Sequence, residues 1–135
     1  MLLRRFLLLL AIVWASPWTL LGLLAGLVAL ATGGAMQRTG KVIECYGGTL
    51  RWLLLKAPIV GGASAMTLGH VVIGRSLADI ERTRAHEAVH VAQYERWGLF
   101  FIPAYFACSI WLWFRGRNPY FDNPFEREAY GRELE

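Results

Sequence analysis

Two histidines and a glutamate stand close together in the stretch His86-Glu87-Ala88-Val89-His90, which reads H-E-x-x-H. Residues four apart lie on one face of a helix, one turn above each other, so both imidazoles can bind one metal ion. The glutamate after the first histidine projects beside that ion, where it can take a proton from a metal-bound water. The pattern therefore predicts that His86 and His90 bind a metal and that Glu87 is a general base. The alternative is a polar helix face that carries two solvated histidines.

A third ligand must come from elsewhere, because catalytic zinc normally takes three protein ligands and leaves one position for water. The one other histidine in the sequence is His70. Because it lies among β-branched residues, we expect His70 to be a packed strand residue that does not bind the metal. A carboxylate is therefore expected, and the C-terminal segment offers Glu126 and Glu128. Two helical residues at this spacing point about 200° apart, so only one can face the ion. Glu126 can also be the capping-box partner of Asn123, which leaves the choice open.

The helix that carries H-E-x-x-H has recognisable ends. Ser76 can cap its first turn, with Asp79 three residues further on in an approximate capping box, and Gly98 can end it. The predicted helix spans residues 77–97. Gln93 follows His90 by three residues and lies on the same side, where it can bond a ligand, a substrate or water. A second, C-terminal helix is predicted to begin at Asn123 as the cap, with a proline at its first helical position.

The N-terminal part of the chain is unusually apolar. Residues 6–31 form a nearly uninterrupted apolar run of about 26 residues, or about 39 Å of helix, enough to cross a hydrocarbon core of about 30 Å with tilt. A cleavable signal peptide is the competing interpretation, with Val13 and Ala15 at small-residue cleavage positions. The second apolar stretch, 20–31, favours an uncleaved anchor. Residues 1–35 are therefore predicted to be a membrane anchor, with the lipid bilayer as partner.

The middle of the chain predicts a small sheet. Residues 33–40 suggest a linker, and 41–46 and 49–55 predict two strands joined by a Gly-Gly hairpin turn. Residues 66–74 predict a third strand. With the two helices, these strands predict an α+β fold, in which residues 36–135 form one small domain. Net charge is +4, but no basic stripe is interleaved with aromatic residues, which argues against a nucleic-acid partner.

A second apolar segment, residues 99–114, follows the H-E-x-x-H helix. At about 24 Å as a helix it is short for a crossing, and its many aromatic residues favour the membrane interface. If it crossed the bilayer, Glu126 would lie on the opposite face from His86 and His90 and could not share an ion with them. We therefore expect this segment to dip into the bilayer or to lie in its interface.

H-E-x-x-H followed by a short helix with Glu-x-x-Ala resembles the gluzincin group of zinc metallopeptidases, which includes membrane-embedded bacterial members. In that group the third zinc ligand is a Glu, with Ala three residues later and usually Asp or Asn after it. Glu126 and Ala129 match this pattern, whereas Tyr130 departs from it. The stretch 67–130 also resembles small bacterial membrane proteins with the same layout. The resemblance implies a zincin-like unit in the cytoplasmic membrane of a bacterium.

This resemblance implies a membrane-anchored zinc metallopeptidase. His86, His90 and Glu126 would hold Zn²⁺, Glu87 would activate the water, and a peptide or protein substrate would lie along a strand edge. A second hypothesis, from another class, is a metal-binding or scaffolding membrane protein that keeps the zincin-like site without turnover. A third is a membrane segment with incidental histidines, which predicts no bound metal. Replacing Glu87 separates the first two, because only an enzyme would lose activity.

Overall fold

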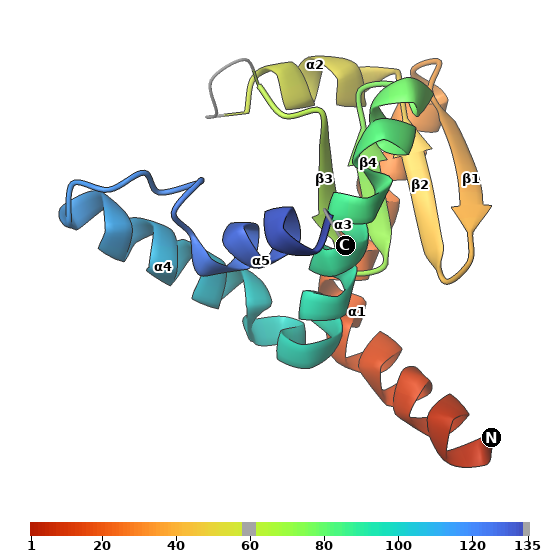
Figure 1. The fold of residues 1–135 in the computed structure, drawn as a ribbon. Helices are drawn as coiled ribbons and strands as arrows, with labels where there is room; N and C mark the ends of the chain where they lie inside the picture. The colour runs from red at the N-terminus through yellow and green to blue at the C-terminus, as the bar shows by residue number, and fades with distance from the viewer. Residues whose placement is uncertain (58–61, 134–135) are drawn as a thin grey trace.

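Five α-helices and four strands make up the described part of the chain, residues 1–57 and 62–133 of a computed structural model (Figure 1). In chain order the elements are α1 (Leu2–Ala31), β1 (Ala35–Thr39), β2 (Val42–Tyr46), α2 (Thr49–Leu55), β3 (Ala65–Leu68), β4 (Val71–Gly74), α3 (Leu77–Trp97), the 3-10 turn η1 (Gly98–Phe100), α4 (Phe101–Phe114) and α5 (Pro124–Glu133). The expected α+β chain with a long apolar N-terminal helix is confirmed.

The four strands form one mixed sheet in the order β1-β2-β4-β3. β1 pairs with β2, and β3 with β4, in antiparallel fashion. The central pair, β2 and β4, is parallel, which the sequence did not predict. Parallel neighbours need a crossover connection, and here α2 and β3 lie between the two strands in the chain. β3 is left at one edge of the sheet.

The predicted linker at 33–40 is wrong, because it contains β1. β1 pairs along its length with β2, from Ala35 opposite Tyr46 to Thr39 opposite Val42. The hairpin turn therefore lies at Gly40 and the residue after it, and Gly40 has φ +61°, a backbone conformation that favours glycine. The predicted Gly-Gly hairpin turn instead leads into a helix.

Two further strand predictions are corrected. Residues 49–55 form helix α2 instead of a strand, because Leu50 and Leu54, one helical turn apart, are both buried in the core. Residues 66–74 form two strands instead of one. Gly69, with φ +63°, reverses the chain between β3 and β4, so these strands form a hairpin.

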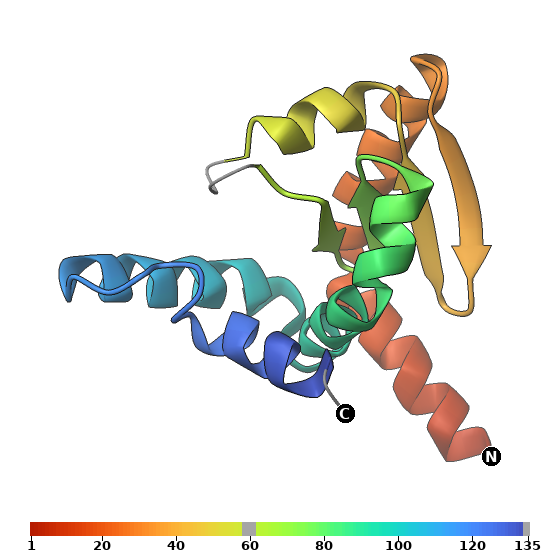
Figure 2. The same cartoon turned by 45° about the horizontal axis from the view of Figure 1, so that its top comes forward.

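Helix α1, although long and apolar, is also one layer of the fold. α1 and α2 pack on one face of the sheet and α3 on the other (Figure 2). A Cβ atom on Gly22 would lie 2.7 Å from the Val71 Cβ, and one on Gly26 would lie 2.5 Å from the Cys45 Sγ. These two glycines, one helical turn apart, thus let α1 pack closely against the sheet.

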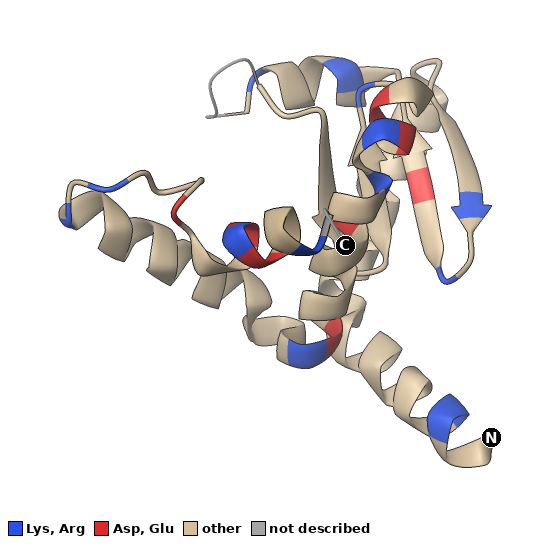
Figure 3. Ribbon diagram, in the orientation of Figure 1, with Lys and Arg blue, Asp and Glu red and all other residues tan. Residues whose placement is uncertain are grey.

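Within the residues that the structure describes, two helical stretches are long and apolar enough to cross a membrane, Leu2–Ala31 and the continuous run Leu77–Phe114. Both leave many large apolar side chains exposed, above all on α1 and α4. Figure 3 shows that α4 carries no Lys, Arg, Asp or Glu, whereas charged residues gather on α3, α5 and the β1–β2 hairpin. This distribution indicates that the apolar helices associate with a membrane.

Candidate metal centre

The helix that carries H-E-x-x-H has the predicted ends. The Ser76 Oγ accepts a hydrogen bond of 3.1 Å from the Asp79 backbone N–H, and α3 runs from Leu77 to Trp97. Gly98 ends the helix with φ +54°, where a Cβ atom would collide with the Trp14 ring of α1. Along the helix between these ends, the H-E-x-x-H face is buried against the rest of the fold.

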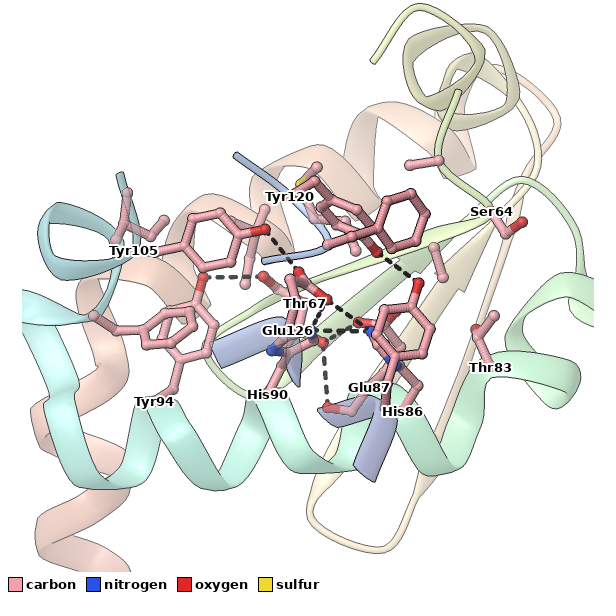
Figure 4. Close-up of a pocket in the computed structure, with 18 of the residues that line it drawn as sticks. Ser64, Thr67, Thr83, His86, Glu87, His90, Tyr94, Tyr105, Tyr120 and Glu126 are labelled. Atoms are coloured by element: carbon pink, nitrogen blue, oxygen red, sulfur yellow. Dashed lines mark hydrogen bonds and ion pairs between the residues drawn. The ribbon is translucent and has the colours of Figure 1, made fainter. Parts of the chain in front are cut away.

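His86, His90 and Glu126 converge on one point (Figure 4). The two Nε2 atoms lie 3.2 Å apart, and the Glu126 Oε2 lies 3.1 Å from the His86 Nε2 and 3.3 Å from the His90 Nε2. All three residues are buried. Ligands bound tetrahedrally at 2.0–2.1 Å from zinc lie about 3.3 Å from one another. The spacing of these three atoms therefore fits a zinc ion, although other metals accept the same donor set.

Of the two candidate carboxylates, the structure brings Glu126 to the histidines and not Glu128, which pairs with Arg96. Asn123 caps α5 as predicted, because its Oδ1 accepts a hydrogen bond of 3.0 Å from the Phe125 N–H. The Glu126 side chain points into the site instead. Burial raises the pKa of Glu126, but hydrogen bonds with the histidines outweigh burial and lower it to about 2. The carboxylate is therefore charged at neutral pH.

The chain reaches this arrangement because it turns back after α4. The Ser109 Oγ donates to the Pro119 carbonyl at 2.8 Å. The Asn123 amide donates to the Tyr105 carbonyl and to the Ser109 Oγ. Residues 115–123 thus run back along α4, and α5 packs on α3 (Figure 1). The apolar segment 99–114 therefore does not separate Glu126 from the two histidines.

Further side chains orient the three converging residues. The His90 Nδ1 lies 2.8 Å from the Gln93 Oε1, so an Nδ1–H donated there leaves Nε2 as the metal-facing atom. The Gln93 amide in turn donates to a backbone carbonyl of α5. The Tyr105 hydroxyl donates to the Glu126 Oε1 at 2.7 Å. The Tyr130 ring, at the position that departs from the gluzincin pattern, packs 4.4 Å from the His86 ring.

Glu87 lies beside the histidines and is also buried. Burial raises the pKa of its carboxyl, which the nearby His90 and a hydrogen bond from Thr67 oppose. The Thr67 Oγ1 donates to the Glu87 Oε2 at 2.7 Å, and the Thr67 carbonyl accepts from the Tyr94 hydroxyl at 3.0 Å. A carboxylate with a raised pKa suits a general base near neutral pH. Sequence reasoning missed Thr67 and Tyr105, because neither belongs to a motif.

A cleft of about 440 Å³ opens over these residues between β3, α3, α4 and α5. His70 does not line it. The His70 Nε2 lies 2.9 Å from the Glu95 Oε1, which also binds Lys41, so His70 lies outside the group, as expected. No known protein family, curated protein or solved structure matches the chain. The interpretation of the site therefore rests on its geometry.

Proposed function

We propose that this protein is a membrane-anchored zinc metallopeptidase of the gluzincin type, with the bacterial cytoplasmic membrane as its location. The observation that carries the proposal is the meeting of three buried donors, His86, His90 and Glu126, within 4.8 Å of one another. Glu87 stands beside them in an accessible cleft. The exposed apolar faces of α1 and α4 support the membrane location.

Two imidazole nitrogens and one carboxylate oxygen are the ligand set of many catalytic zinc sites with an open position. A zinc ion held there would act as a Lewis acid that polarises a carbonyl and makes water more acidic. Glu126 brings the negative charge, and the hydrogen bond from Tyr105 holds its carboxylate in place. Gln93 orients His90 in the same way.

Glu87 would act as the general base. Its carboxylate would accept a proton from the water that attacks the scissile carbonyl and would then donate that proton to the departing amine. Thr67 fixes one carboxylate oxygen by its hydrogen bond. Thr67 also belongs to edge strand β3, which lines the cleft. An extended peptide that pairs with this edge would lie next to Glu87.

The test compares Glu87→Gln with Glu81→Gln, a matched change at an exposed position of α3. Both purified variants should retain zinc, measured by plasma emission spectrometry. Cleavage of denatured proteins, read by mass spectrometry of the fragments, should fall on the order of 10²–10⁴-fold for Glu87→Gln only. Bound zinc without Glu87-dependent cleavage would favour the non-catalytic alternative. Absence of bound metal would favour incidental histidines.

A further inference from the structure

The two ends of the cleft differ in polarity. At one end Arg82 donates to the Ser64 Oγ at 3.0 Å, and Thr83 lies beside them. The other end is walled by Phe106 of α4, whose ring centroid lies 5.9 Å from that of Tyr105. In Figure 4 Ser64 and Thr83 lie on one side of the site and Tyr105 of α4 on the other, with the metal-binding candidates between them. A bound peptide would therefore meet polar groups at one end and apolar groups at the other.

The apolar end of the cleft continues onto the outer surface of α4. Phe106 lines the cleft and is 58% exposed, and Ile110 and Phe114 extend the exposed apolar surface along the same helix. α4 carries no charged side chain (Figure 3). A chain that leaves the cleft at this end thus passes directly onto the surface that associates with the membrane.

Strand β3 provides a backbone edge that runs between the two ends. Among the described strands it pairs only with β4, and the Ser64 carbonyl accepts the Arg75 N–H from the β4 side. Backbone groups alternate in direction along a strand, so those of Ala65 and Thr67 point away from β4. β3 begins at Ala65, directly after Ser64 at the polar end. Toward the apolar end the Thr67 carbonyl accepts from the hydroxyl of Tyr94, whose ring is 4.3 Å from the Phe101 ring.

We propose that the cleft binds the stretch of another membrane protein that directly follows a membrane-spanning segment, where the chain leaves the bilayer. The apolar segment would lie on α4, and the emerging polar stretch would pair with β3 toward Ser64. Antiparallel pairing, the more stable arrangement per residue, places the apolar segment on the N-terminal side. The inference rests on the proposed function and names its substrate class.

Binding to the full-length Glu87→Gln protein in phosphatidylcholine vesicles tests the inference without requiring cleavage. The first probe peptide has an apolar helix of about 20 Leu and Ala residues followed directly by a fluorescent polar segment. The second has the same parts separated by a flexible linker of about 20 Gly and Ser residues. Both probes partition equally into the vesicles, so a difference in binding reports the junction. We expect the direct junction to bind at least tenfold more tightly.

Two matched variants locate this preference on the protein. Phe106→Ser changes the wall of the cleft, and Phe6→Ser makes the same change at a similarly exposed position of α1, outside the cleft and away from α4. The preference should fall at least fivefold for Phe106→Ser and remain for Phe6→Ser, with zinc content unchanged in both. Equal binding of the two probes, or a preference that survives Phe106→Ser, would overturn the inference. If the junction is preferred but the wild-type protein cleaves neither probe, the proposed peptidase activity fails and the binding inference stands.

Discussion

The assignment of Glu126 as a ligand makes a quantitative prediction for Glu126→Gln. The substitution keeps the size of the side chain and removes its charge, while the side chain stays buried beside two imidazoles. Removing one partner from a buried charged group costs on the order of 3–5 kcal/mol. Since about 1.4 kcal/mol is tenfold, zinc affinity should fall roughly 10²–10⁴-fold.

Glu128→Gln is the matched control, two residues away on the same helix. Its carboxylate pairs with Arg96, whose side chain is 52% exposed. Losing an exposed ion pair costs up to about 1 kcal/mol of stability, and zinc affinity should stay within about twofold of the wild-type value, since Glu128 lies outside the group of ligands.

Competition with a chromophoric zinc chelator at one pH measures both affinities, and thermal unfolding shows that both variants are folded. A larger loss for Glu128→Gln would move the ligand to that residue and remove the match to Glu-x-x-Ala. Small, equal losses would show that no carboxylate from α5 reaches the metal.

Three further predictions concern the fold. Gly26→Leu places side-chain atoms where Cys45 packs and should destabilise the docking of α1 by about 1–3 kcal/mol; protease sensitivity would report it, and an unchanged digestion pattern would contradict the close contact. The hydrogen bond from Arg84 lowers the pKa of Glu44 below 4.5, although burial of the carboxylate acts in the opposite direction. The stability that this interaction contributes is present above pH 4.5 and should be lost as pH falls through the lowered pKa. Glu44→Gln should lower the free energy of unfolding at neutral pH by about 2 kcal/mol, seen as a lower Tm, and should weaken the loss of stability in acid. An unchanged loss of stability in acid would contradict this role of Glu44. The protein should remain in membranes after carbonate extraction with residues 1–35 intact, whereas a mature N-terminus near Ser16 would favour the signal peptide.

The elements around the site were predictable where the signals are local. Ser76 and Gly98 mark the ends of α3 by side-chain and backbone chemistry within a few residues of the helix. Asn123 does the same for α5. The 3.6-residue periodicity of the helix then places His86 and His90 on one face. For these features the chain neighbours determine the structure.

The sheet could not be read in the same way. The apolar run 49–55 is too short for its periodicity to distinguish a strand from a helix. Its packing against the sheet is what favours helix α2. The parallel pairing of β2 with β4 joins segments separated by a helix and another strand. Tyr105 and Thr67 likewise reach Glu126 and Glu87 through tertiary contacts. Sequence spacing carries no signal for such contacts.

The metal content of the purified protein tests the central claim most directly. Plasma emission spectrometry of the full-length chain, extracted in mild detergent without chelators, should find about one zinc ion per molecule. His86→Ala and His90→Ala should each abolish it, since each removes one of the three converging donors. Absence of a bound metal in the wild-type protein, or stoichiometric zinc retained when both histidines are replaced, would contradict the assignment of this site.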